Sequence, residues 1–279
     1  AAPMRDTDDR ALDGEFAGSF PSGDGEAGGD LVATFTVFTP PTTFVVTAMD
    51  PEPDSILGVL PRTLTLTLSR DIDAATLADA VDLIASGGDG TFGNGNDLRL
   101  TPGLATVALS GADTIAITLN AFFPSLADTF RVTVRDTLED TGAEALDGEF
   151  AGTLPSGDGT EGGDFDVEFE VRVLPKLTSI QANVFDVTCT QCHFGDPEFA
   201  PQGLSLDEEH AYDLLVGIAS TEKPEYQRVE SGNPDDSYLI RKLEGGPDIL
   251  GTRMPQFGEA LEPEVIAAIR QWITDGASR

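Results

Sequence analysis

Basic residues are scarce in this chain of 279 residues, where 16 lysines and arginines stand against 49 aspartates and glutamates. The formal net charge is −33, and a surface of that charge repels nucleic acids and anionic membranes. Long apolar runs are missing too, since none approaches the roughly 18 residues that a membrane-spanning helix needs. We therefore expect no nucleic-acid partner and no membrane span.

Cysteine and histidine are also rare, with two of each in the chain. The sequence begins Ala-Ala-Pro-Met, which is typical of a mature N-terminus after signal-peptide cleavage. We therefore expect an exported protein, located in the periplasm, at the cell surface or outside the cell. With 40% hydrophobic residues, the chain has enough apolar material to form real cores.

The composition changes near residue 175. The preceding part is rich in Val, Thr, Leu, Phe and Gly, with the alternation of apolar and polar residues that is typical of strands. Gly, Pro and Asp clusters separate the expected strands, which predicts an antiparallel sandwich over 41–174. This part resembles a bacterial Ig-like domain of surface and secreted proteins. The clearest strand segments are 63–69, 114–119, 129–134 and 164–173.

Helical patterns follow from Leu177 onward. Ser205 and Glu208 have the spacing of a capping box, which predicts the start of a helix. Pro263 and Gly276 stand where a last helix is expected to begin and end. The fold class expected is thus multidomain, with an all-β Ig-like sandwich followed by an all-α domain over 175–279.

One internal repeat joins the two ends of the predicted β region. Residues 11–30 match 145–164 at 16 of 20 positions. The first copy, within 1–40, predicts an orphan hairpin or strand that repeats the end of an Ig-like domain. It either adds to a sheet edge of its own chain, pairs with a neighbouring copy to give a homo-oligomer or filament, or belongs to a processed piece of a longer protein. We favour pairing between copies.

The two cysteines stand three residues apart and are followed at once by a histidine, so that Cys189, Cys192 and His193 form C-x-x-C-H. Two thiols at this spacing add to the vinyl groups of one haem, and the next residue on the same helical turn places an imidazole under the iron. A chance match and a redox-active C-x-x-C pair are the alternatives. The motif predicts one covalently attached haem c with His193 as an iron ligand.

The sixth iron ligand has four candidates, which are His210, Met4, Met49 and Met254. Met254 lies in a loop stiffened by Pro255, and a thioether there is a soft ligand that favours Fe(II) and raises the potential. His210 is expected in the middle of a helix, at or near the surface. We therefore expect Met254 to be the ligand.

With these motifs, residues 177–279 resemble a class I-type monohaem cytochrome c domain, from the helix that leads into C-x-x-C-H to the Met-Pro-Gln-Phe-Gly loop and the last helix with its tryptophan. The resemblance implies that the carbonyl of Pro201 accepts the N–H of the haem histidine and so fixes its tautomer. It also implies a contact of Arg253 or Lys242 with the haem propionates.

Three loops, 13–30, 88–97 and 147–164, are dense in Asp, Asn and Gly. Calcium prefers such oxygen ligands on a flexible backbone, although the spacing does not fit an EF-hand. Tight turns that need these residues for positive φ are the alternative. The candidate calcium ligands are Asp89, Asn94, Asn96, Asp97, Asp147, Glu149, Asp158 and Asp164.

These features together predict an exported monohaem protein that transfers electrons to and from redox partner proteins and is not an enzyme. An Ig-like module would display the haem domain or build it into an assembly. The alternative is a structural or adhesive surface protein with an accessory haem domain. A haem enzyme such as a peroxidase needs an open sixth position or a second haem, and the chain offers one motif and a methionine ligand.

Overall fold

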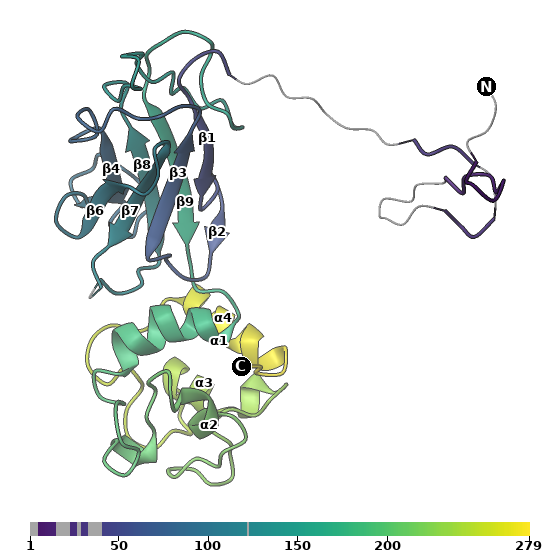
Figure 1. Cartoon of the computed structure of the whole chain (residues 1–279). Helices are drawn as coiled ribbons and strands as arrows, with labels where there is room; N and C mark the ends of the chain where they lie inside the picture. Colours follow the sequence, from purple (N-terminus) through teal and green to yellow (C-terminus); the bar gives the residue numbers. More distant parts are fainter. Residues whose placement is uncertain (1–4, 15–22, 27–28, 33–40, 122) are drawn as a thin grey trace. The chain divides into compact units, whose positions relative to one another are not determined.

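The computed structural model (Figure 1) describes residues 5–14, 23–26, 29–32, 41–121 and 123–279. The chain divides into two compact units, Ala1–Pro40 and Pro41–Arg279. The orphan hairpin or strand expected within 1–40 includes residues 33–40, which lie outside the described residues, so its pairing with another copy stays a prediction. Among the helices that the structure describes, none has the length and apolar character to cross a membrane.

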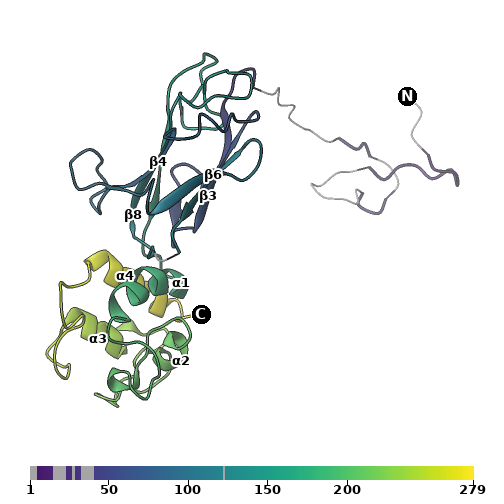
Figure 2. The same ribbon diagram turned by 60° about the vertical axis from the view of Figure 1, so that its left-hand side comes forward.

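The second unit contains a four-stranded and a five-stranded sheet among its described residues (Figures 1 and 2). The orders are β1-β3-β7-β6 and β2-β9-β8-β4-β5, and every pair is antiparallel except β2 with β9. The strands are β1 (Val46–Asp50), β2 (Ile56–Leu57), β3 (Thr63–Leu68), β4 (Val81–Ala85), β5 (Leu98–Arg99), β6 (Ala105–Leu109), β7 (Thr114–Leu119), β8 (Asp128–Val134) and β9 (Phe165–Val171).

Strand β9 shows why these segments form a sandwich. Its alternate residues Phe165, Val167, Phe169 and Val171 are buried, as the alternation predicts, and they join one apolar core between the sheets. Phe130 on β8 is opposite Phe169, and the two rings stack at 5.2 Å between centroids. Burying each such side chain contributes about 1.5–3 kcal/mol.

The residues after β9 form short helices around a second, separate apolar core (Figure 1). Ile180, Phe185, Ile269 and Trp272 are among the side chains buried in it. The helical elements are α1 (Leu177–Ile180), the π-helix η1 (Gln181–Cys189), the 3₁₀ turns η2 (Pro201–Gly203) and η3 (Pro234–Asp236), α2 (Ala211–Leu215), α3 (Tyr238–Glu244) and α4 (Pro263–Thr274).

The expected large all-α cytochrome c domain is wrong. The fold is mainly a β-sandwich, and the longest described helix, α4, has 12 residues. The helix expected from Ser205 is reduced to the five residues of α2, because the Ser205 hydroxyl donates to the Asp207 carboxylate instead of capping a helix. Gly217, Pro224 and Gly232 then interrupt any helix in the following segment.

Asn183 fastens the helical part to the sandwich within the second unit. Its side-chain amide donates to the Gly58 carbonyl at 2.7 Å and accepts the Ser125 hydroxyl at 2.7 Å. Gly58 leaves room for this contact, since a Cβ there would meet the Ser179 side chain at 3.1 Å. The start of η1 is therefore held by two turns of the sandwich.

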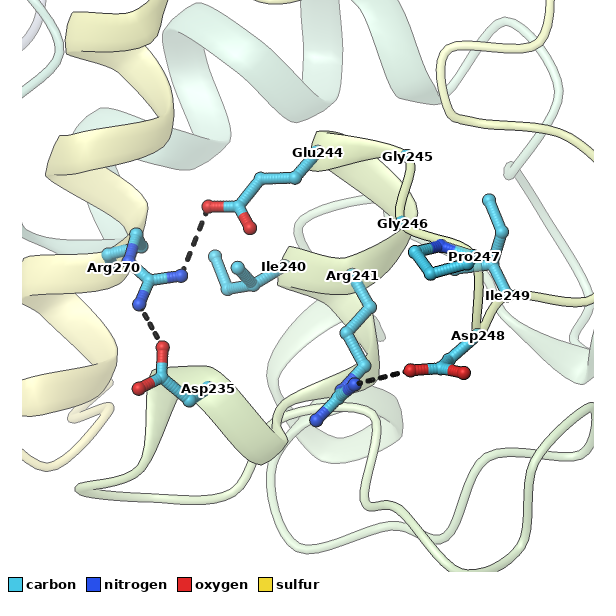
Figure 3. Close-up of a pocket in the computed structure, with 10 residues that line it drawn as sticks. All are labelled: Asp235, Ile240, Arg241, Glu244, Gly245, Gly246, Pro247, Asp248, Ile249 and Arg270. Carbon is cyan, nitrogen blue, oxygen red and sulfur yellow. Dashed lines mark hydrogen bonds and ion pairs between the residues drawn. The ribbon is translucent and has the colours of Figure 1, made fainter.

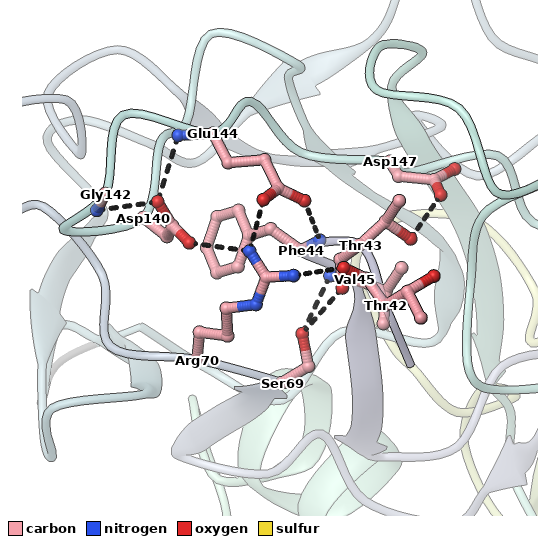
Figure 4. A network of polar contacts seen from close by, with 10 residues as sticks. All are labelled: Thr42, Thr43, Phe44, Val45, Ser69, Arg70, Asp140, Gly142, Glu144 and Asp147. Atoms are coloured by element: carbon pink, nitrogen blue, oxygen red, sulfur yellow. Dashed lines mark hydrogen bonds and ion pairs between the residues drawn. The ribbon is translucent and has the colours of Figure 1, made fainter. Parts of the chain in front are cut away.

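Arg70 closes the opposite end of the sandwich (Figure 4). Its guanidinium donates to the Asp140 carboxylate at 2.9 Å, to Glu144 and to the carbonyl of Thr42. Glu144 in turn accepts the backbone N–H of Phe44 at 3.1 Å. This network joins the residues before β1 to the loop before the second copy of the repeat.

Acid is expected to weaken the sandwich through Asp140. Burial of this carboxyl acts to raise its pKa, but the N–H groups of Glu144 and Gly142 and the Arg70 guanidinium outweigh burial, so the pKa lies below its ordinary value. The carboxylate therefore stabilises the fold above the unfolded pKa of about 3.9, and this contribution is lost as the pH falls through the lower folded pKa. Urea unfolding between pH 7 and pH 2 measures it.

The matched comparison for this pH dependence uses Asp140→Asn and Asp71→Asn, the latter at an exposed position one residue from Arg70. Asp140→Asn is expected to flatten the loss of stability below about pH 4, and Asp71→Asn to leave it as in the wild type. Equal acid profiles for all three proteins would contradict the role of Asp140.

The described residues of the two repeat copies share one hydrogen-bond arrangement. In the second copy, the Asp147 carboxylate accepts the N–H of Asp158 at 2.8 Å and that of Gly159 at 3.0 Å. The first copy repeats this arrangement with Asp13, which accepts the N–H groups of Asp24 and Gly25 at 3.0 and 2.9 Å. The repeated sequence therefore favours these hydrogen bonds in both copies.

Candidate functional site

The C-x-x-C-H motif lies on one helical turn at the end of η1. The N–H groups of Cys192 and His193 donate to the carbonyl of Cys189 at 3.1 and 2.8 Å, which closes the turn. Cys189 packs against the second core and Cys192 is exposed, and neither forms a disulfide. Residues three and four apart on such a turn share a face, so both thiols and the imidazole are presented together.

Cys189 is not built as a redox-active thiol. Burial raises its pKa to about 12, and the charges of Asp186 and Cys192 add to this effect. Reactive cysteines need the opposite, a lowered pKa that populates the thiolate at neutral pH. The raised pKa makes Cys189 itself a poor attacking thiol at neutral pH.

The ring of His193 is held by the backbone of the segment that follows. Its Nδ1 lies 2.9 Å from the carbonyl oxygen of Leu204, and its own carbonyl accepts the N–H of Leu206 at 2.7 Å. The resemblance implied Pro201 as the partner, but the Pro201 carbonyl accepts the Leu204 N–H at 3.1 Å inside the turn η2. With Nδ1 donating to Leu204, Nε2 carries the free lone pair.

Asp207 binds both sides of this segment. Its carboxylate accepts the N–H of Gly195 at 3.1 Å, the hydroxyl of Ser205 at 2.9 Å and the ring Nδ1 of His210 at 2.6 Å. Burial acts to raise the pKa of Asp207, but these donors outweigh burial and the pKa lies below its ordinary value. His210 is therefore engaged with a carboxylate at the start of α2.

Among the methionines considered as the sixth ligand, Met254 packs against the same apolar core as Cys189 of the motif. It packs against the second core, and its N–H donates to the Lys242 carbonyl at 2.7 Å. Met49 is buried in the sandwich core on β1, and Met4 lies outside the described residues. Lys242 also donates to the Leu250 carbonyl at 2.8 Å, which ties the Met254 loop to α3.

Arg253 lies beside Met254 and packs its aliphatic stem on Gly245, where a Cβ would meet its Cδ at 2.9 Å. Gly245 has φ +77°, a left-handed conformation that favours glycine, so this close approach is built into the end of α3. The Nη1 atom of Arg253 is buried and has no hydrogen-bond partner within residues 41–121 and 123–279. It is a donor that lacks an acceptor.

A concavity of about 230 Å³ lies next to this loop (Figure 3). Its charges are paired among themselves, since Arg270 donates to Asp235 and to Glu244 and Arg241 lies 3.8 Å from Asp248. The pairs join η3, α3 and α4, so this concavity serves the packing of the helices.

Exposed apolar side chains flank the motif and the Met254 loop along the sequence. Phe194 and Phe199 follow the motif and are 68% and 83% exposed, while Phe257 follows Met254 and is 78% exposed. In the part of the chain that the structure describes, no other phenylalanine is this exposed. Exposing such rings to water is unfavourable, and covering them with a further apolar group would stabilise the protein.

The acidic loop of the second repeat brings three of the predicted calcium ligands together. Carboxylate oxygens of Asp147, Glu149 and Asp158 all lie within 4.8 Å of one another. Asp147 is fully buried and also accepts the Thr43 hydroxyl at 2.6 Å. Asp164 points elsewhere, since it accepts the N–H of Asp136 at 2.9 Å.

The predicted calcium loop 88–97 is held by hydrogen bonds among its own residues. Asp89 accepts the side-chain amides of Asn94 at 2.7 Å and Asn96 at 3.1 Å, and Asp97 accepts the N–H of Gly93 at 2.7 Å. The hydrogen bond from the Thr91 N–H is the main cause of a lowered pKa at Asp89. Burial acts to raise this pKa, and the hydrogen bonds from Asn94 and Asn96 lower it further. These side chains act as turn residues here.

Sequence comparison finds no family model and no curated protein that matches the chain. Among solved structures, the copper resistance protein PcoC from Escherichia coli is similar at 16% identity and a TM-score of 0.32, covering 46% of this chain and 98% of its own. CopC from Methylosinus trichosporium OB3b is similar at 8% identity and a TM-score of 0.28, covering 46% and 92%. The N-terminal part of the bacterial S-layer protein SbsC is similar at 16% identity and a TM-score of 0.25, covering 43% and 23%.

The resemblance to a class I-type cytochrome c domain fused to an Ig-like domain is therefore corrected. The similar structures named above are copper-resistance and S-layer proteins and not cytochromes, and the helical part lacks a large all-α domain.

Proposed function

We propose that this chain carries one haem attached through Cys189 and Cys192, with His193 as iron ligand, and transfers electrons. The observation that carries the proposal is the 2.9 Å contact between His193 Nδ1 and the Leu204 carbonyl. This contact orients the imidazole and leaves Nε2 for a metal, as outer partners of ligating histidines generally do. The proposal stands on the chemistry of C-x-x-C-H and not on membership of a family.

The residues around the motif fit this group. The two free thiols lie on one turn, and the buried Arg253 Nη1 lacks an acceptor of the kind that a propionate carboxylate supplies. The exposed rings of Phe194, Phe199 and Phe257 offer the apolar cover that a porphyrin face needs. A bound haem would supply an iron that exchanges one electron between Fe(II) and Fe(III).

In this proposal the protein moves electrons and makes no bonds. Met254, on a loop tied to α3 through Lys242, is the proposed sixth ligand, and an occupied sixth position leaves no place for a substrate. We also propose that the protein is exported and that its sandwich displays the haem-carrying part. The acidic surface of net charge −33 suits basic redox partners.

The absorption spectrum of the full chain, made in a host that attaches haem, tests this function. The expected result is a low-spin spectrum when oxidised and when reduced, with no change on adding CO. A five-coordinate haem that binds CO would replace electron transfer with an enzymatic role. A haem-free protein would leave the structural or adhesive alternative.

Calcium binding in the second repeat is a second proposal, favoured by the three carboxylates within 4.8 Å. At a concentration about 100 times its dissociation constant, calcium is expected to raise the melting temperature by roughly 5 °C, because it would bind only the folded loop. Asp158→Asn is expected to abolish the rise. The exposed Glu161 in the same loop lies outside the group, so Glu161→Gln should keep it. Equal melting curves with calcium and with chelator would overturn the proposal.

A further inference from the structure

A buried cation lies behind the turn that holds His193. Arg228 is 7% exposed, and its guanidinium donates to the carbonyls of Gln202 at 2.6 Å, Gly203 at 3.3 Å and Leu214 at 2.8 Å. Within residues 41–121 and 123–279, no carboxylate forms an ion pair with it. Desolvation by this burial lowers its pKa. Burying a charge without a counter-charge costs free energy, so the buried position of Arg228 needs a structural or functional reason.

The turn that Arg228 binds is itself strained. Gln202 has φ +58° and Gly203 has φ +63°, two successive residues in the left-handed region. A non-glycine residue there costs of order 1–3 kcal/mol unless its surroundings hold it, and such strain gathers at functional sites. The carbonyls of these two residues point at the guanidinium of Arg228, which is what holds them.

The strained turn leads directly to the contact of the proposed iron ligand. Leu204 follows Gly203, and its carbonyl is the one that the His193 ring contacts at 2.9 Å. Arg228 is anchored on its far side, because its N–H donates to Ile218 at 2.7 Å and its carbonyl accepts the Leu239 N–H at 2.9 Å. Hydrogen bonds and the backbone from Gly203 to Leu204 thus connect α3 through Arg228 to the imidazole of His193.

We propose that Arg228 is the positioning residue for His193, fixing the ring in the tautomer with the proton on Nδ1 by holding the carbonyl of Leu204 in place. This inference rests on the proposed function, in which Nε2 faces the iron. It adds a residue that neither the motif nor its spacing indicates, and it acts through backbone carbonyls rather than on the haem.

The test compares Arg228→Gln and Arg228→Lys with the wild-type full chain, each made with and without haem attachment. Nitrogen-15 NMR of the haem-free chain reads the tautomer of His193, because a ring bound through Nε2 would have only one tautomer, and circular dichroism reads the melting temperature. Arg228→Gln is expected to raise the population of the minor tautomer about tenfold, and Arg228→Lys, which keeps the charge, by less. Arg279→Gln is the control, because Arg279 is exposed and pairs with Asp213 at the surface.

A lower melting temperature with an unchanged tautomer would overturn the proposal, because Arg228 would then be a structural residue only. Loss of the fold in both variants would overturn it for the same reason. The mass of the wild-type chain made in a host that attaches haem reports separately on haem attachment. A bare polypeptide mass would sink the proposed function, while the tautomer comparison would still decide the role of Arg228.

Discussion

The Cys192→Ala variant is expected to carry clearly less covalent haem than the one haem per molecule expected of the wild-type chain. Each thioether needs its own sulfur, and the turn at the end of η1 presents two. With the exposed Cys192 sulfur removed, attachment through the half-buried Cys189 alone leaves one of the two thioethers. Mass spectrometry of the denatured protein measures the covalent haem directly, and Cys189→Ala with Cys192→Ala should give the bare polypeptide mass.

His193→Ala separates attachment from ligation. It is expected to keep some covalent haem, because both sulfurs remain, and to lose the low-spin spectrum, because the imidazole beside Leu204 is gone. Thr190→Ala, between the cysteines, is the control, since its hydroxyl donates only to the Asp186 carbonyl at 2.9 Å. Wild-type protein without covalent haem, from a host proven to mature such proteins, would contradict the proposed function outright.

Replacing Asp147 with alanine is expected to lower the free energy of unfolding of the sandwich by about 3 kcal/mol. The carboxylate is fully buried and accepts three donors, from Thr43, Asp158 and Gly159. Its removal takes away the shared acceptor of these three donors and frees the loop from the residues before β1. Urea denaturation followed by circular dichroism measures the change.

Two further variants sharpen this result. Asp147→Asn keeps the shape but has only one oxygen for three donors, so an intermediate loss is expected. Glu161→Ala, at an exposed position of the same loop, is expected to change the free energy by less than about 0.5 kcal/mol. If Asp147→Ala were as stable as Glu161→Ala, the carboxylate would not be what holds this loop.

The strands could be read from the sequence because their pattern is local. In β9, Phe165, Val167, Phe169 and Val171 alternate with polar residues and are buried as expected. The last helix was also predicted correctly, since α4 runs over Pro263–Thr274 as Pro263 and Gly276 indicated, but the helix expected from Ser205 was not. Periodicity indicated a helix from Ser205, but the Asp207 carboxylate binds Ser205 and His210 and leaves five helical residues in α2. Side chains that compete for backbone groups decide such cases.

By itself, the sequence determined the C-x-x-C-H motif, the alternation that builds the sandwich and the loop geometry that Asp13 and Asp147 share, since each depends on residues close together in the chain. Only the tertiary structure decided that Leu204 and not Pro201 meets the His193 ring, and that Arg228 supports it from behind. Those contacts are made by backbone carbonyls. Every residue has one, so the residue types in the sequence do not indicate which carbonyl will be used.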